Sequence, residues 1–395
     1  MHDAGLHLQL LLLPTAAANA ASAMRLTMQL VREDWRARWQ RFIYALAVAL
    51  AFGVVLTCQV EGQTVPYGDR ITEYPIPPGG DEFRLIQPEG IASGPDGALW
   101  FTEDGGHRIG RITTAGAVTE YRKSAPGAIA LGPDRAMWIS GLRVGKIVRI
   151  TTAGAISESQ RLSDPVEGAA GIAAGPDGAL WFTEPLAGVI GRMTTDGVVA
   201  KYYLEAISNE QAHGNPSGIV TGPDGALWFN DTASGAIGRI TTAGAITRYA
   251  LPTHPANMGG TSGWGVPIEA AAGPNIAVGP DGALWFTESG ADRIGRITTA
   301  GAITEFSVRP PPPTLDNPIP VSGPQGIAAG RDGALWFTQS GADKIGRITT
   351  AGAITNFQLP RVPDRRAKPM GITAGPDGAM WFTEEGTWKI GRIAP

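Results

Sequence analysis

Two histidines and three carboxylates are the side chains of this 395-residue sequence that could support catalysis or metal binding. His213 and His254 each lie in a stretch without regular patterning, and Asp231 and Glu288 end the next apolar runs. Glu385 stands near the C-terminus. Imidazoles and carboxylates that meet at one site can bind a divalent metal or transfer protons. The two histidines are therefore candidate catalytic bases and the three carboxylates candidate metal ligands; the alternative is that the histidines are solvated loop residues and the carboxylates are structural.

The motifs that identify many other enzymes are missing from the sequence. It contains no P-loop, no nucleophile elbow, no dinucleotide-binding glycine motif and no helical metalloprotease motif. The single Cys58 excludes an internal disulfide framework and a cysteine-based zinc site. The net charge of −4 gives no electrostatic reason to expect nucleic-acid binding.

The elements that must position the candidate residues are short and numerous. The chain has 54 Gly and 31 Pro, a content that disfavours long helices and suits short strands joined by tight turns. One tryptophan recurs in seven similar units at intervals of 38 to 57 residues: Trp100, Trp138, Trp181, Trp228, Trp285, Trp336 and Trp381. Repeats of this period and composition are typical of a β-propeller.

Each unit is expected to form four antiparallel strands. In residues 324–357, the small apolar segment GIAAG leads to Asp332-Gly333, a pair that favours a tight hairpin turn, and then to ALWFT, KIGRITT and AITNF. In the second unit Arg135 replaces the turn glycine, so we expect that turn to differ. The sequence therefore predicts an all-β protein, a seven-bladed β-propeller with four-stranded antiparallel blades, over residues 65–395.

The two ends of this region indicate how the ring closes. Residues 71–74, Ile-Thr-Glu-Tyr, match an outer strand but have no blade before them. The last unit stops at KIGRIAP and lacks an outer strand. We therefore expect an N-terminal outer strand to complete the last blade and close the ring, which removes sheet edges that invite aggregation.

Residues 1–64 are expected to be an N-terminal leader. Residues 42–58, FIYALAVALAFGVVLTC, form an unbroken apolar run, and three arginines stand just before it at positions 36 to 41. This arrangement is typical of a signal peptide or a short membrane anchor. We expect export to the periplasm or the medium, with cleavage or with retention through residues 42–58; lipid attachment at Cys58 is a further alternative.

Function is expected where the repeats differ from one another. Residues shared by five or more units serve turns and packing, whereas the variable connections gather on one face around the central channel. We expect this loop face to bind a small-molecule or extracellular ligand. We expect a monomer that contacts a membrane only through its N-terminal segment.

The repeated pattern resembles one known family. The segments G-P-D-G-x-L-W-F-T-E, I-G-R-I-T and G-x-I-T-E-[YF] recur over residues 69–395 and are similar to those of the virginiamycin B lyase (streptogramin B lyase) family of seven-bladed propellers. The resemblance implies a Mg²⁺-dependent carbon–oxygen lyase that linearises a cyclic depsipeptide by elimination, without water. Such an elimination needs a base for a proton next to a carbonyl and a cation for the developing negative charge.

The family's catalytic positions carry other residues in this chain. The histidines of the family's Pro-His-[AG]-Ile segments in the last two blades correspond to Gln325 and Met370, neither of which is a base. The family's acid before the last of these segments corresponds to Lys368, and its acid after the last Trp-Phe segment to Glu385. Glu89 occupies the aligned position in the first unit. We expect Gln325, Met370 and Glu89 to contact a ligand.

Three functions therefore stay open from the sequence. The first is a propeller that binds a ligand or a partner without catalysis. The second is a lyase of the family type whose site has moved to His213 and His254. The third is a lactone hydrolase on a similar propeller, for which Asn230, Asp231 and Asn275 would supply metal-binding oxygens.

Overall fold

In the computed structural model of the chain, the repeats fold into antiparallel sheets whose hairpin turns lie at the Asp-Gly pairs. Gly97 has φ 75°, a left-handed conformation that glycine adopts without steric cost, and Gly94 N–H donates to Ala98 O at 2.8 Å across the turn. Arg135 takes the same conformation, with φ 60°, and the equivalent hydrogen bond is also 2.8 Å long. The prediction that the second turn differs is therefore wrong, because arginine accepts a left-handed backbone at a cost of about 1 kcal/mol.

The structure describes residues 64–65, 70–77, 86–104, 106–122, 127–141, 145–159, 162, 168–205, 214–252, 275–308 and 322–395. The chain divides into two units, Met1–Gln63 and Thr64–Pro395. Everything described here belongs to the second unit. The predicted leader and the candidate bases His213 and His254 lie outside the described residues.

The described residues form seven sheets, which we number as blades in chain order. The first four blades are β3 (Pro88–Ser93), β4 (Ala98–Glu103), β5 (Arg108–Thr113), β6 (Val118–Arg122); β7 (Ile129–Leu131), β8 (Met137–Ser140), β9 (Ile147–Ile150), β10 (Ile156–Glu158); β11 (Ile172–Ala174), β12 (Leu180–Glu184), β13 (Val189–Met193), β14 (Val199–Tyr203); and β15 (Pro216–Thr221), β16 (Leu227–Asp231), β17 (Ala236–Ile240), β18 (Ile246–Ala250). The last three are β19 (Ile276–Val278), β20 (Leu284–Glu288), β21 (Arg293–Ile297), β22 (Ile303–Ser307), with a 3₁₀ turn at Ser289–Ala291; β23 (Pro324–Ala329), β24 (Ala334–Gln339), β25 (Lys344–Thr349), β26 (Ile354–Gln358); and β27 (Pro369–Ala374), β28 (Met380–Glu384), β29 (Lys389–Ile393) with β2 (Ile71–Pro75).

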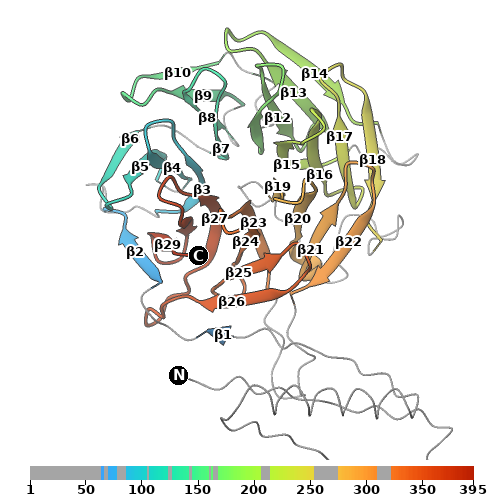
Figure 1. Ribbon diagram of the computed structural model, residues 1–395. Coiled ribbons are helices and arrows are strands. Elements are labelled where there is room, and N and C mark those ends of the chain that lie inside the picture. The colour runs from blue at the N-terminus through green and yellow to red at the C-terminus, as the bar shows by residue number, and fades with distance from the viewer. Residues whose placement is uncertain are drawn as a thin grey trace, which may run out of the picture. The chain divides into compact units, whose positions relative to one another are not determined.

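The blades surround a central channel, with the first strand of each blade innermost (Figure 1). The prediction of a seven-bladed β-propeller with four-stranded antiparallel blades is confirmed. In blade 7 the outer strand is β2, which pairs antiparallel with β29 from Ile71 opposite Ile393 to Pro75 opposite Lys389. Blade 6 carries one further strand, β1 (Thr64–Val65), parallel to β26.

The hydrophobic core lies between neighbouring blades. One cluster, for example, joins Ile91 and Phe101 of blade 1 to Trp381 and Ile390 of blade 7. The repeated tryptophan is fully buried in six of the blades and stacks there on an aromatic ring of the outer strand, as Trp100 does on Tyr121 with ring centroids 5.6 Å apart. The residues common to the repeats thus serve packing, and they leave the variable connections for function.

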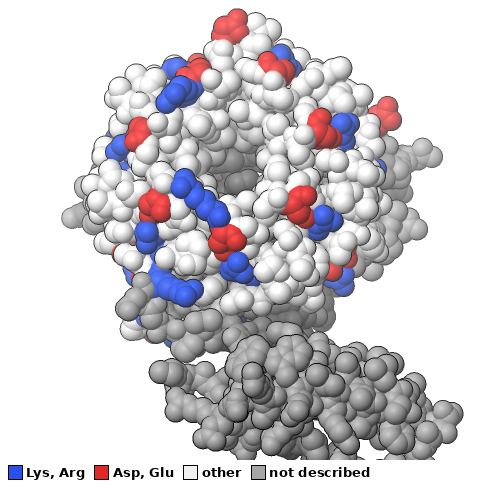
Figure 2. Space-filling model, viewed as in Figure 1, with Lys and Arg blue, Asp and Glu red and all other residues white. Residues whose placement is uncertain are grey.

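The repeated aspartates and arginines brace the turns at one end of the channel. Asp96 accepts hydrogen bonds from Trp100 Nε1 at 3.2 Å and from Arg111 Nε at 2.7 Å. Burial opposes ionisation, but these bonds lower the pKa of Asp96 below its usual value. Equivalent Asp–Arg pairs occur in all seven blades. Figure 2 shows the resulting acidic and basic neighbours around the central opening.

Candidate functional site

The end of the channel away from these turns is organised by hydroxyl groups of blades 2, 3, 5, 6 and 7, which link each of these blades to the next. Thr338 Oγ1 accepts a hydrogen bond from Gly326 N at 2.9 Å and donates one to Met370 O of blade 7 at 2.6 Å. Thr383 likewise accepts from Gly371 N at 2.9 Å and donates to Glu89 O of blade 1 at 2.7 Å. The threonine that the repeats share after Trp-Phe is therefore structural, and it fixes the backbone at the second residue of the next inner strand.

Gln325, Met370 and Glu89 occupy this second position in three consecutive blades, on β23, β27 and β3. Each backbone carbonyl accepts a threonine hydroxyl from the preceding blade, that of Gln325 from Thr287 at 2.7 Å. All three residues are partly buried. We call them the mouth arc, because they form a continuous part of the channel mouth across blades 6, 7 and 1. The structure thus brings the three predicted ligand contacts together.

Glu385 lies beside the mouth arc and is neutralised by a lysine. Both carboxylate oxygens are 3.2 Å from Lys368 Nζ, and Gln87 Nε2 donates to Oε1 at 3.3 Å. Lys368 itself has a left-handed backbone, with φ 46°, on the connection that enters β27. A metal ion at this carboxylate would have to displace the ammonium group of Lys368 from both oxygens.

Asp231 and Glu288 end the second strands of blades 4 and 5 and are almost fully buried, with 1% and 7% exposure. Asp231 lies 3.2 Å from Arg248 Nε and accepts a hydrogen bond from Asn215 N at 2.9 Å. Glu288 lies opposite Arg293 in the strand register. Both carboxylates therefore belong to the charge arrangement inside their own blades.

Glu384 holds the same strand position in blade 7, and its pKa is raised well above the usual value of a carboxyl group. Its side chain has no exposed surface and accepts a hydrogen bond from Thr387 Oγ1, while the neighbouring Lys389 pairs with Glu73 of β2. Burial, together with the negative charge of Glu73, raises the pKa of Glu384 to about 7. This carboxyl is thus half protonated near neutral pH.

The three predicted metal ligands come from three different blades, 4, 5 and 7. Among the described residues no group of three His, Cys, Asp or Glu side chains is placed to hold a metal ion. Catalysis by His213 and His254 stays a prediction, because both lie outside the described residues. The ion pair of Lys368 with Glu385 was not predicted, although both residues had been aligned with family positions and their opposite charges could have suggested it.

The channel below the mouth is apolar. It encloses about 440 Å³ and is lined by short side chains of the inner strands, such as Ala92, Ala173, Val220 and Ala328. Its lining contains no ionisable side chain. The polar side chains of this lining are the hydroxyls of Thr221 and Thr373.

These features define the class of the protein: a seven-bladed β-propeller whose variable polar residues gather at one mouth of an apolar channel. A model of the virginiamycin B lyase family matches residues 59–214 and 256–395. The chain belongs to the virginiamycin B lyase family, which confirms the resemblance found in the sequence.

Solved structures of this family are similar over most of the propeller. A streptogramin B lyase structure is 32% identical, with a TM-score of 0.66, and the match covers 82% of this chain and 97% of that one. Selenomethionine-substituted virginiamycin B lyase from Staphylococcus aureus is 34% identical, with a TM-score of 0.67, covering 82% and 99%. A catalytically inactive histidine-to-alanine variant of the Staphylococcus aureus enzyme with quinupristin is 35% identical, with the same TM-score and coverage.

Proposed function

We propose that the protein is an exported propeller that binds a small-molecule or extracellular ligand at the mouth arc without breaking it. The observation that carries this proposal is the pairing of Glu385 with Lys368, next to Met370 and Gln325. A thioether and an amide cannot take up a proton near neutral pH. The carboxylate beside them is already neutralised by the lysine.

The elimination catalysed in the family needs a base and a cation, and the mouth arc does not provide this pair. A base must stand within hydrogen-bond reach of the proton that it removes, and a cation must face the oxygen that becomes negative. Glu384, with its raised pKa, is fully buried inside blade 7 and so has no contact with a ligand at the surface. The mouth arc itself contains one ionisable side chain, Glu89.

The residues at the arc do not fit a Mg²⁺ ion. Mg²⁺ needs oxygen ligands in near-octahedral geometry, and an ammonium group close to a carboxylate competes for the same oxygens. Lys368 Nζ holds both oxygens of Glu385 at 3.2 Å. We therefore derive no step of a reaction through a metal at this place.

The side chains of the arc favour a ligand with both apolar surface and hydrogen-bond donors. Met370 offers a polarisable apolar contact. Gln325 Oε1 is buried and accepts no hydrogen bond from the described residues, so a donor such as a peptide N–H would pair with it once the side chain turns outward. Peptide-like compounds combine these properties.

Incubation of the purified chain with a streptogramin B and Mg²⁺, followed by chromatography and mass spectrometry, tests this function. We expect the compound to stay unchanged while a known lyase opens it in parallel. A product of unchanged mass would mean elimination and would overturn the proposal. A product heavier by one water would mean hydrolysis and would also overturn it.

A binding measurement distinguishes a site that binds a ligand without catalysis from a surface that binds no ligand. We expect replacement of Met370 and Gln325 by alanine to weaken binding of a ligand recovered from an extracellular metabolite pool. Gly225→Ala, at the opposite end of the channel, is the control for a general loss of stability, since φ 71° strains alanine there while the added Cβ would meet no atom within 4 Å.

A lyase with a displaced site is the second candidate, and membership of the family favours it. In that case an elimination product forms, and alanine at His213 or His254 abolishes it. If catalysis instead needs the histidine positions of the family, opening of a streptogramin B would require the substitutions Gln325→His and Met370→His.

Export rests on the sequence of residues 42–58 and their arginine flank. Within the described residues, no helix has the length and apolar character needed to cross a membrane. Sequencing of the mature N-terminus from the periplasm, the medium and the membrane fraction distinguishes cleavage from anchoring.

A further inference from the structure

A pocket on blade 6 carries an excess of positive charge. It encloses about 400 Å³ between the loop that joins β24 to β25 and the connection from β26 to β27. Its lining includes four cationic residues and one carboxylate: Lys344, Arg361, Arg365, Arg366 and Asp343. None of the residues of the mouth arc, and neither Lys368 nor Glu385, lines it.

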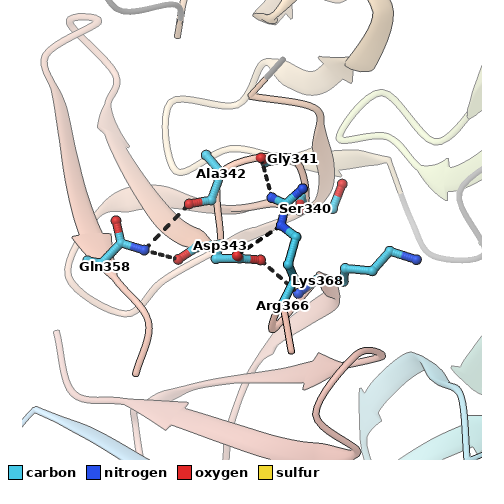
Figure 3. Close-up of polar contacts among 7 residues, drawn as sticks. All are labelled: Ser340, Gly341, Ala342, Asp343, Gln358, Arg366 and Lys368. Carbon is cyan, nitrogen blue, oxygen red and sulfur yellow. Dashed lines mark hydrogen bonds and ion pairs between the residues drawn. The ribbon is translucent and has the colours of Figure 1, made fainter. Parts of the chain in front are cut away.

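The wall of this pocket is held by a hydrogen-bond network (Figure 3). Arg366 Nε lies 3.1 Å from Asp343 Oδ2, and its Nη2 donates to the carbonyl of Gly341. Gln358 Nε2 donates to Asp343 O at 2.9 Å, and Lys368 N donates to Asp343 Oδ1 at 3.0 Å. The only carboxylate of the lining is therefore occupied by Arg366 and a backbone N–H, and it does not neutralise the other cations.

Lys344 is a cation that lacks in blade 6 the glutamate partner found in four other blades. A cation at the start of the third strand pairs with a glutamate of the outer strand in four blades: Arg108 with Glu120, Lys146 with Glu158, Arg293 with Glu305 and Lys389 with Glu73. In blade 6 the outer-strand position is Asn356, whose Oδ1 accepts a hydrogen bond from Gln339 Nε2 at 2.6 Å. Lys344 consequently makes no ion pair or hydrogen bond through its ammonium group with any described residue.

Arg361 and Arg365 add two cations whose charges are not compensated by the described residues. The guanidinium of Arg365 lies 4.2 Å above the centroid of the Trp388 ring. A stacked guanidinium keeps its N–H edge available, and that edge matches carboxylate and phosphate geometry. The turn that presents Arg365 is closed by its backbone N–H, which donates to Val362 O at 3.2 Å, with Asp364 at φ 60°.

We propose that this pocket binds an anionic small molecule bearing a carboxylate or a phosphate group. The ligand's charge takes the place of the glutamate that four other blades supply internally. Lys344 acts as a point charge, and Arg361 and Arg365 donate from planar groups. The proposal stands independently of the mouth arc, because the two sites share no lining residue.

Isothermal titration of the full chain with citrate and with inorganic pyrophosphate at low ionic strength tests this site. We expect saturable one-to-one binding of at least one of the two anions. Asn356→Glu restores the internal partner of Lys344, and we expect it to weaken binding roughly ten-fold or more, the range for loss of a charge-assisted contact. Arg361→Gln changes an exposed residue, and we expect a similar loss.

Lys146→Gln is the matched control, because Lys146 holds the same strand position in blade 2 but is paired with Glu158 at 2.7 Å. We expect it to leave affinity unchanged. Thermal unfolding of each variant shows whether the fold persists. Binding of citrate alone identifies a carboxylate ligand, and binding of pyrophosphate alone a phosphate ligand. Absence of saturable binding by both anions, or an equal loss in Lys146→Gln, overturns the proposal.

Discussion

Glu384 shows how one buried carboxyl makes the stability of the ring depend on pH. Its pKa rises from 4.5 to about 7, because the side chain is buried and Glu73 lies nearby. Below pH 4.5 the carboxyl is protonated in the folded and the unfolded chain. Between pH 4.5 and about 7 the unfolded chain ionises first, so the folded state loses relative stability as the pH rises, and above about 7 the whole cost is present.

Glu384→Gln should therefore stabilise the protein at high pH. We expect a gain of about 3 kcal/mol in the free energy of unfolding at pH 8, and almost none at pH 4. The isosteric amide is already used at this position in blade 6, where Gln339 is 2% exposed and hydrogen bonded. Urea unfolding at both pH values measures the difference.

The control for this residue lies at the same strand position in blade 3. Glu184 has no exposed surface and pairs with Lys201 at 2.8 Å. Glu184→Gln should lower stability at pH 8, because Lys201 then loses its partner. A gain for Glu384→Gln that is equal at both pH values would contradict the assignment of the raised pKa.

At the scale of the strand, the hydroxyl group of the threonine after Trp-Phe accepts one hydrogen bond and donates another. Thr338 accepts from Gly326 N and donates to Met370 O, and it has no exposed surface. Thr338→Val keeps the shape but leaves a buried N–H and a buried carbonyl unpaired. We expect a loss of about 3 kcal/mol in the free energy of unfolding, measured by urea denaturation.

Thr349→Val is the comparison for that strand. Thr349 Oγ1 accepts from Ala353 N at 3.1 Å in an exposed turn of the same blade, where water can replace it. The loss there should not exceed about 1 kcal/mol. Equal losses in the two variants would show that the inter-blade hydrogen bond of Thr338 stabilises the fold no more than an exposed turn hydrogen bond does.

The same strands show what could and could not be predicted from the sequence. The spacing of the tryptophans and the Asp-Gly turns predicted the blades, because each blade repeats the same local hydrogen bonding. Alignment of the repeats also placed Gln325, Met370 and Glu89 at one register. The pairing of Lys368 with Glu385 was missed although the opposite charges could have suggested it, because the path of the connection also depends on the contact of Asp343 with Arg366, which the repeat pattern does not reveal.

At the scale of the whole molecule, β2 joins the N-terminal end of the propeller sequence to its last blade, because it pairs with β29. Tyr74 of β2 stacks on Trp381 with centroids 5.4 Å apart, and a Cβ at Gly116 of blade 1 would collide with its ring. Tyr121 makes the equivalent contacts inside the chain, with Trp100 at 5.6 Å and with Gly154 of blade 2. The two tyrosines differ mainly in that Tyr74 comes from the opposite end of the propeller sequence.

Tyr74→Ala and Tyr121→Ala should therefore lower the free energy of unfolding by the same amount, about 3 kcal/mol each. In a closed ring every blade is supported on both sides, so loss of either ring destabilises the whole and leaves a single unfolding transition. Urea denaturation followed by tryptophan fluorescence and by circular dichroism measures the two losses and shows whether the transitions coincide. A much smaller loss for Tyr74→Ala, with fast amide exchange restricted to β2 and β29, would mean instead that the N-terminal strand opens independently of the other blades.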